Sequence, residues 1–382
     1  MAPLKVLHLS AGNMYGGVET LLLTLARCRH LRPEMEPHFA LCYEGRLSRE
    51  LTAENVPLHF LGAVRASRPW TVRRSRDRLR RLLDHESFDA VISHMCWPHM
   101  IFGPVVLQRI RNLIYWAHSG NEGSHWTERW ASRTKPAMVI ANSDFVSQSS
   151  GELFSDVPTR VLYYPISPPE HDGLLRSRDT VRKEFGVSGS TTVIIQVSRM
   201  EPWKGHATHL QALARLKGLP DWVCWIVGGA QNPDERRYLA GLQSKARETG
   251  IGDRVVFMGQ RTDVSSLLTA ADIFCQPNLS PEPFGIVFVE ALLAGLPVVG
   301  TAIGGVKEIV DSSCGILVSP NHSEELAMVL RGLIQDPQMR THLGTQGPIR
   351  AGQLCDPRRQ LTGLHAACAT FSVRPAALAG AV

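Results

Sequence analysis

Short apolar runs alternate with amphipathic stretches along the chain. Residues 4–9 (LKVLHL) predict a buried strand, and residues 18–29 predict a helix with Leu21, Leu22 and Leu25 on one face. The first half holds further predicted strands at residues 38–42, 58–61, 89–93, 112–116, 138–141 and 160–163. Because strands that alternate with helices form parallel βαβ units, this half predicts a doubly wound α/β domain.

The second half repeats this pattern after a proline-rich segment. Residues 164–172 (YPISPPEHD) carry prolines that oppose a continuous helix or strand, and they predict a domain linker. The strands predicted beyond it are residues 192–197, 223–227, 255–258, 273–276, 297–300 and 315–318, and the helices are residues 206–216, 236–249 and 323–334. We therefore predict domains over residues 1–168 and 173–355, with a last helix over residues 356–372. Ligands of such domains bind at the carboxyl ends of the strands, which we expect to face a shared central cleft.

Composition fits two ordinary domains and an anionic ligand. The chain has 382 residues, of which 44% are hydrophobic and 20% charged, so large cores can form. The formal net charge of +6 favours nucleotide phosphates, anionic lipid surfaces or nucleic acid without choosing among them.

Cysteine usage and hydropathy bear on the compartment. None of the eight cysteines stands at C-x-x-C spacing, and several lie in apolar runs, which predicts buried free thiols in a reducing compartment. The N-terminus lacks a signal-peptide pattern, and no run of about 18 apolar residues is present. We expect a cytoplasmic protein, with peripheral attachment at the inner membrane face left open.

The most informative stretch is residues 282–297 (EPFGIVFVEALLAGLP). A helix is predicted to begin near Gly285, so the backbone N–H groups of residues 284–287 form an anion site for phosphate. Glu290 stands inside an apolar run, where a carboxylate needs a partner such as ribose hydroxyls. Glu282 precedes the helix and is placed to accept hydrogen bonds from sugar hydroxyls. The alternative is that both acids merely cap and salt-bridge a helix start.

Three other segments follow predicted strands. Arg199 and Lys204, in residues 197–204 (VSRMEPWK), are cations of the kind that stabilise a diphosphate leaving group, although both also fit solvated surface charges. Gly16 and Gly17, in residues 11–19 (AGNMYGGVE), permit close backbone approach to a ligand, but they do not form the G-x-G-x-x-G fingerprint, and an ordinary turn explains them equally. His118, in residues 115–121 (YWAHSGN), stands past a strand and is either a site residue or a structural histidine.

Together these segments resemble glycosyltransferase family 4, the retaining enzymes of the GT-B fold with two Rossmann-like domains. The matching pieces are GGVE at residues 16–19, S-R…K at 198–204 and the E-x7-E pattern at 282–290, followed by GLPVVGTAIGGVKEIV at 295–310 and GILV at 315–318. The resemblance covers nearly the whole chain and implies that the last helix crosses back onto the N-terminal domain.

The resemblance also implies roles for single residues. The residues implied as catalytic are His118, Arg199, Lys204 and Glu282. The residues implied as donor-binding are Gly16, Gly17, Arg199, Lys204, Gly259, Glu282, Phe284, Gly285, Ile286, Val287 and Glu290. In this scheme the two cations hold the diphosphate, His118 and Glu282 contact the transferred sugar, Glu290 binds the ribose, and Gly259 lies in a strand end that lines the base.

Such enzymes retain the anomeric configuration by front-face attack, in which the leaving phosphate helps to deprotonate the acceptor. No D-x-D motif is present, so neither a metal nor another cofactor is implied beyond the nucleotide-diphosphate sugar. Uridine is the expected base, with guanosine next. The acceptor is a small molecule, glycan or lipid contacted by the variable loops at residues 94–100 and 121–130.

A basic stretch departs from this picture. Residues 65–81 hold eight arginines and one acid, Asp77, and with Leu79, Leu82 and Leu83 they predict an amphipathic helix. That helix suits either docking on anionic lipid or a solvated basic face. Other functions stay open: a nucleotide-sugar epimerase or a phosphorylase of the same fold, or a non-catalytic binder of nucleotides or nucleic acid, although we expect no nucleic-acid partner.

Overall fold

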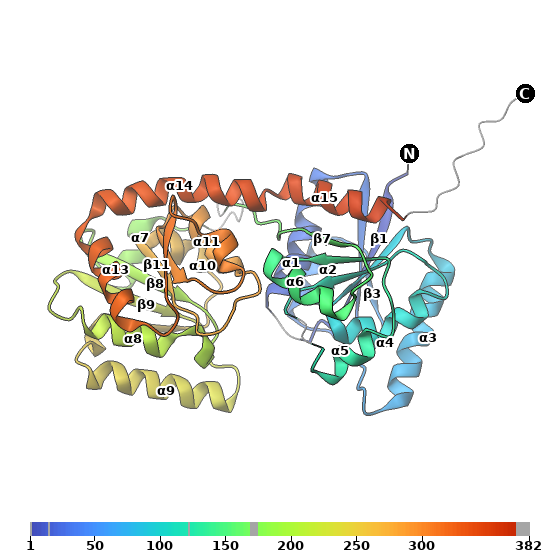
Figure 1. Ribbon diagram of the computed structural model, residues 1–382, viewed down its shortest axis with the longest axis horizontal. Coiled ribbons are helices and arrows are strands. Elements are labelled where there is room, and N and C mark those ends of the chain that lie inside the picture. Colours follow the sequence, from blue (N-terminus) through green and yellow to red (C-terminus); the bar gives the residue numbers. More distant parts are fainter. Residues whose placement is uncertain (1, 14–15, 121–122, 169–174, 372–382) are drawn as a thin grey trace, which may run out of the picture. The chain divides into compact units, whose positions relative to one another are not determined.

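A computed structural model describes residues 2–13, 16–120, 123–168 and 175–371 (Figure 1). The chain divides into two compact units: unit 1 comprises residues 1–165 and 355–382, and unit 2 comprises residues 166–354. Residues 169–172 of the predicted linker, residues 121–122 of the predicted acceptor loop and residue 372 of the predicted last helix lie outside the described ranges.

Unit 1 is built on a parallel sheet of seven strands in the order β3-β2-β1-β4-β5-β6-β7. The strands are β1 (Leu4–Ser10), β2 (Met35–Leu41), β3 (Leu58–Phe60), β4 (Ala90–His94), β5 (Leu113–Ala117), β6 (Met138–Ala141) and β7 (Thr159–Val161). The helices are α1 (Gly17–Arg27), η1 (Cys28–Leu31), α2 (Arg46–Ala53), α3 (Pro69–His85), α4 (Cys96–Val106), α5 (Trp126–Ala131), α6 (Asp144–Leu153) and α15 (Pro357–Ala369).

Helices cover both faces of this sheet because side chains alternate along each strand. On β2, Phe39 and Leu41 join a buried cluster with α1 and α2. Ala40, between them, joins the cluster formed with α3, α4 and α6. Helix α15 packs against β1 and η1, and the C=O of Cys368 accepts a hydrogen bond from Nδ2 of Asn112 at 2.7 Å (Figure 1). The last helix therefore belongs to unit 1.

Unit 2 has a parallel sheet of six strands in the order β10-β9-β8-β11-β12-β13. The strands are β8 (Thr192–Val197), β9 (Trp222–Val227), β10 (Val255–Gly259), β11 (Ile273–Gln276), β12 (Val298–Thr301) and β13 (Gly315–Val318). The helices are α7 (Arg178–Glu184), η3 (Pro202–Lys204), α8 (His206–Ala214), α9 (Pro233–Glu248), η4 (Gly252–Arg254), α10 (Val264–Ala270), α11 (Ile286–Leu293), α12 (Val306–Ile309), α13 (Ser323–Gln335) and α14 (Pro337–Cys355).

Each sheet reverses its strand order once, between its first and fourth strands. The reversal lies between β1 and β4 in unit 1 and between β8 and β11 in unit 2. In open parallel sheets, ligands bind outside the carboxyl ends of the strands at this switch point. Each unit therefore carries a defined place where site residues are expected.

The arginine-rich helix differs from the prediction. Helix α3 begins at Pro69, so Arg65 and Arg68 precede it instead of lying in its first turns. Proline at the first helical position is favourable, because its missing N–H has no partner inside the helix there. Inside α3, Leu79 and Leu83 are buried.

Other elements differ from the sequence interpretation as well. Residues 96–100 and 126–130, expected in acceptor loops, lie in helices α4 and α5. Strand β2 starts at Met35 and therefore includes Pro37, which the sequence interpretation left outside the strand. Proline is tolerated at this position because Pro37 pairs with β1 on one side and lies before the residues that pair with β3 on the other. Helix α14 was not predicted, since its sequence contains Pro348 and three glycines. Two of those glycines are needed: a Cβ on Gly344 would stand 2.3 Å from the Gly295 oxygen, and one on Gly347 would stand 2.6 Å from the Leu292 oxygen.

The eight cysteines are all buried and free, as predicted. In the described part of the chain, none of the helices has the length and apolarity that a bilayer span requires.

Candidate functional site

Arg199, two residues beyond β8, has acidic partners. Its Nη2 lies 3.0 Å from Oε1 of Glu235 and 3.3 Å from Oε1 of Glu201. The side chain is 41% exposed, while its buried Nε has no hydrogen-bond partner among the described residues. The guanidinium is thus oriented by acids and still accessible to an anion from solvent.

Glu235 holds Arg199 and was missed by sequence reasoning. It is 5% exposed in the first turn of α9, and it accepts hydrogen bonds from the N–H of Gln231 at 2.5 Å and from Arg199. Desolvation acts to raise the pKa of Glu235, but these donors outweigh it, so its pKa lies below the ordinary value. In the sequence, Glu235 is an acid three residues after Asn232, which is the ordinary pattern of a helix start. That pattern gives no sign that Glu235 also binds Arg199.

Lys204 and Glu282 are in direct contact. Nζ of Lys204 lies 2.5 Å from Oε2 of Glu282, and the side chains are 12% and 13% exposed. Nδ2 of Asn278 donates to the same carboxylate oxygen at 3.0 Å, and the Lys204 ammonium lies 3.8 Å from the ring centroid of Trp203. Because Lys204 follows β8 and Glu282 follows β11, the pair joins the two strand ends at the switch point of unit 2.

Gly205 determines where Lys204 lies. Its φ is +74°, and a Cβ there would stand 1.8 Å from the carbonyl oxygen of Pro277, so no other residue fits. The N–H of Leu279 donates to the carbonyl of Trp203 at 2.7 Å. These contacts hold η3 against the segment after β11 and bring the lysine to its carboxylate.

Gly304 and Gly305 have the same effect on Glu282. The backbone of Glu282 forms a parallel β-bridge with Gly304, and the N–H of Gly305 donates to the Glu282 carbonyl at 2.8 Å. A Cβ on either glycine would stand 2.5 Å from a backbone oxygen, of Glu282 or of Pro283. Glu282 precedes α11, as predicted, and these backbone contacts fix its position.

Helix α11 begins directly after this segment. Gly285, its N-cap, has φ +96°, and the N–H groups of Ile286 and Val287 are at the helix start, where they have no partner inside the helix. Phe284 is buried, and Glu290 is partly buried one turn further along. This start presents positive backbone dipoles at the switch point, which suits a phosphate.

Gly259 lies on the same edge of the sheet. It ends β10, and its carbonyl accepts a hydrogen bond from the N–H of Gly228 at 2.8 Å. Gly228 has φ +143°, and a Cβ there would stand 1.9 Å from the oxygen of Ser198. These contacts tie the ends of β8, β9 and β10 together, so Gly259 and Arg199 belong to one set of strand ends.

His118 stands in unit 1 in a chain of buried rings. Its Nε2 lies 2.9 Å from Nδ1 of His94, and Nε2 of His94 lies 3.0 Å from Nδ1 of His8. Nδ1 of His118 lies 2.5 Å from the hydroxyl of Tyr164, to which Nδ2 of Asn142 also donates at 3.2 Å. Both ring nitrogens of His118 are therefore engaged by protein groups.

The ring chain is uncharged near neutral pH. Burial lowers the pKa of His118 and of His8 to about 3, and it lowers the pKa of His94 well below its ordinary value. Each neutral ring has one donor and one acceptor, so the tautomers along the chain depend on one another. At its far end, Nε2 of His8 is buried and has no partner among the described residues.

Gly16 and Gly17 open helix α1 with exposed backbone. The φ of Gly16 is −163°, an extended value that any residue adopts, and a Cβ there would meet only Oε2 of Glu19 at 3.8 Å. The N–H of Gly16 donates to that carboxylate at 3.0 Å, while burial raises the pKa of Glu19. The fold itself does not require glycine at position 16, which leaves room for a ligand.

The structure thus sorts the predicted residues into two sets. Gly16, Gly17 and His118 belong to unit 1, and the remaining predicted residues gather at the strand ends of unit 2. Sequence reasoning missed Glu235, Asn278, His8 and Tyr164, and it expected His94 only as part of an acceptor loop. His94 ends strand β4 and carried a usable signal, since a polar residue at the carboxyl end of a buried strand is a site candidate.

Comparisons with known proteins bear on both units. The family model described as glycosyl transferases group 1 matches residues 177–350. The chain is 26% identical, over 71% of its length and 73% of the relative, to the GDP-mannose-dependent alpha-(1-6)-phosphatidylinositol monomannoside mannosyltransferase of Mycolicibacterium smegmatis. It is 31% identical to the GDP-mannose-dependent monoacylated alpha-(1-6)-phosphatidylinositol monomannoside mannosyltransferase of Corynebacterium glutamicum over 44% of this chain, and there it spans 45% of the relative.

Among solved structures, the UDP complex of Anabaena HepE matches 96% of this chain and 100% of that chain, with a TM-score of 0.83 and 24% sequence identity. A likeness at this identity shows the fold, which is the GT-B fold expected from the sequence.

Proposed function

We propose that this chain transfers a hexosyl group from a nucleotide-diphosphate sugar, with retention of configuration and without a metal, because residues 177–350 match the family model described as glycosyl transferases group 1. The observation that carries the proposal is the contact between Lys204 and Glu282 at the switch point of unit 2. The bond that breaks in such a donor joins a sugar to a phosphate. An ammonium and a carboxylate in contact suit these two neighbouring groups, one for phosphate oxygens and one for sugar hydroxyls.

In the proposed reaction, charge develops on the departing diphosphate. Lys204, Arg199 and the start of helix α11 stabilise it, and electrostatic stabilisation of this kind is worth several kcal/mol. Glu282 orients the sugar through its hydroxyls, Glu290 binds the ribose, and Gly259 borders the base. The donor-binding roles expected of Gly16 and Gly17 are part of the same proposal.

His118 contacts the donor sugar in this proposal, and its present contacts set a condition. One of its two ring partners, His94 or Tyr164, must release it before a ring nitrogen meets a sugar hydroxyl. Alternatively, the ring of His118 keeps both hydrogen-bond partners and contacts the sugar only through van der Waals packing. Substitution of Tyr164, described in the Discussion, separates these cases.

We propose GDP-mannose as the first donor to test, because the two relatives in the comparison are named as GDP-mannose-dependent. UDP-glucose is the second choice, which the uridine expectation and the UDP complex of HepE favour. Thermal melting of the full chain with each nucleotide sugar tests this, since a ligand of the native state raises the melting temperature. Radiolabelled transfer then tests turnover. Activity lost in EDTA would contradict the metal-free mechanism.

For the acceptor we propose a membrane lipid reached by peripheral contact through helix α3. Both relatives are named for phosphatidylinositol mannoside acceptors. Three arginines of α3, Arg73, Arg76 and Arg80, help to line a surface cavity of about 610 Å³, and Trp70 beside them is 66% exposed. A cationic helix with an exposed indole suits an anionic membrane surface.

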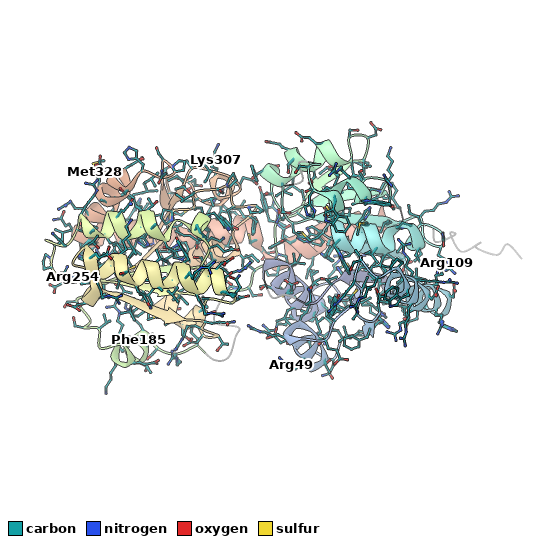
Figure 2. The ribbon with its side chains drawn as sticks, turned by 90° about the horizontal axis from the view of Figure 1, so that it is seen from below. Arg49, Arg109, Phe185, Arg254, Lys307 and Met328 are labelled. Atoms are coloured by element: carbon teal, nitrogen blue, oxygen red, sulfur yellow. The ribbon has the colours of Figure 1, made fainter. Side chains whose placement is uncertain are left out.

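Co-sedimentation with vesicles tests this contact. The Arg73→Glu variant should bind anionic vesicles about thirtyfold more weakly, since one basic residue near the surface contributes about 1 kcal/mol and reversal doubles the change to about 2 kcal/mol. The control is Arg49→Glu on helix α2, an exposed arginine outside α3 (Figure 2). Equal losses in both variants, or equal binding to zwitterionic vesicles, would remove α3 from the proposal.

A further inference from the structure

A second group of polar side chains lies at the edge of the unit 1 sheet. His38 on β2, His59 on β3 and Glu86, the residue after α3, each offer one ligand atom, and these atoms all lie within 4.8 Å of one another. Strand pairing sets Ala40 beside His59, so His38, two residues before Ala40, shares that face of the sheet. The three residues come from different elements that converge on one point.

The spacing of these atoms fits a tetrahedral metal. Nδ1 of His38 lies 3.4 Å from Nε2 of His59 and 3.7 Å from Oε2 of Glu86. With bonds of about 2.0–2.1 Å, ligand atoms around tetrahedral zinc lie about 3.3 Å apart. The two distances from His38 are therefore within half an ångström of those in a zinc site. The side chain of Glu86 is 33% exposed, so its carboxylate has room to move to the same distance from Nε2 of His59.

A fourth side chain, that of Glu36, orients the ring of His38 for metal binding. Nε2 of His38 lies 3.1 Å from Oε1 of Glu36, so this nitrogen donates to the carboxylate and the lone pair is left on Nδ1. A histidine that binds a metal usually donates its other N–H to a carboxylate in this way. This contact is independent of the ligand spacing and favours the same interpretation.

The environment keeps both rings able to bind a cation. Desolvation lowers the pKa of His38 and of His59, although Glu86 acts in the opposite direction on each, so the imidazoles are neutral near pH 7. One cation competes: Nζ of Lys5 lies 3.8 Å from Oε2 of Glu86, with its side chain 39% exposed. Because the Lys5 side chain is partly exposed, its ammonium can move into solvent and leave the Glu86 carboxylate to a metal ion.

We propose that His38, His59 and Glu86 bind one zinc ion, with Glu36 orienting His38 and a water completing the tetrahedron. Two imidazoles and one carboxylate favour zinc over magnesium or calcium, which prefer oxygen ligands. The ion ties β2, β3 and the end of α3 together. It takes no part in sugar transfer, so its loss changes stability and leaves turnover in place.

Calorimetric titration of the untagged full-length chain with zinc chloride, after removal of bound metal with a chelator, tests the proposal. We expect one zinc per chain, and at least a tenfold loss of affinity in His59→Ala, whose side chain is partly exposed. The Glu36→Gln variant should lose about ten- to a hundredfold through the misaligned His38. The control, His30→Ala, replaces an exposed histidine of the same unit and should bind as the parent does.

Two further measurements test the proposal: the melting temperature with zinc, and the zinc affinity of a Lys5 variant. Zinc should raise the melting temperature of the parent and leave that of His59→Ala unchanged. Lys5→Ala should bind zinc more tightly, because the competing cation is gone. The absence of zinc binding, or binding that His59→Ala and His30→Ala retain equally, overturns the proposal.

Discussion

The switch points of the two sheets carry different chemistry. In unit 2 the strand ends bear ion pairs, Lys204 with Glu282 and Arg199 with Glu235. In unit 1 the strands next to the switch point bear uncharged rings, His8 and His94, which lead on to His118. Fixed charges suit the departing diphosphate of the proposed reaction. A chain of neutral rings suits orientation of a polar but uncharged sugar, because it adds hydrogen-bonding groups without charge.

Removal of the central cation should have the largest effect. We expect Lys204→Ala to lower turnover by about 10²–10³-fold, since a cation directed at developing charge is worth several kcal/mol. Glu282→Ala should also lower it strongly. Lys217→Ala, which removes an exposed lysine beyond α8, should match the parent. Steady-state rates with circular dichroism as a fold check measure this, and a parental rate in Lys204→Ala would end the charge assignment.

Two glycines with similar φ values separate backbone strain from steric fit. Gly205 (φ +74°) has the Pro277 oxygen 1.8 Å from a built Cβ, whereas Gly186 (φ +64°) has nothing within 4 Å. We expect Gly186→Ala to cost about 1 kcal/mol and Gly205→Ala more than about 3 kcal/mol, with activity lost as Lys204 leaves Glu282. Urea unfolding measures both. Similar costs would mean that the Pro277 contact does not position Lys204.

The ring chain should respond more weakly than the ion pairs. Tyr164→Phe removes one neutral hydrogen bond to His118, so we expect turnover to fall about five- to tenfold. Tyr238→Phe in unit 2 is the matched control. An increase in turnover would instead indicate that Tyr164 restrains His118 and that its release favours donor contact. Turnover equal to that of the Tyr238→Phe control would show that Tyr164 does not position His118.

The buried histidines of the ring chain should produce the smallest of these effects, a dependence of stability on pH. Because the folded pKa values of His8 and His118 lie at about 3, below the usual 6.5, their contribution is fully present above pH 6.5 and is lost as the pH falls toward 3. The free energy of unfolding should therefore fall from pH 7 to pH 5.5, and His8→Phe should reduce that fall by about 1 kcal/mol. Chemical unfolding at the two pH values measures it, and an identical fall in both proteins would contradict buried neutral histidines.

The sequence predicted the strands of both sheets well because buried parallel strands are short, apolar and bounded by turns. It placed Lys204, Glu282 and Glu290 in the right local context for the same reason, since each follows a predicted strand or opens a helix. It failed at α14, whose Pro348 and glycines oppose a helix locally while Gly344 and Gly347 are required by contacts with residues about fifty positions earlier.

Partners across the sheet were not predictable either. Glu235 reaches Arg199 from 36 residues away, and His8 reaches His94 from 86 residues away. Only the strand order β8-β9 and β1-β4 brings such residues together, and no local pattern encodes it. Long-range pairing, rather than residue type, was the missing information.

Helix α15 has a consequence for biosynthesis. It packs on β1, the first strand of unit 1 in chain order, and it supplies the Cys368 carbonyl to Asn112. On the ribosome, unit 1 therefore cannot complete its own surface until α15 has been made, while unit 2 is one uninterrupted segment of the chain. A chain truncated after residue 354 should accordingly have a protease-resistant unit 2 and an exposed, chaperone-dependent unit 1.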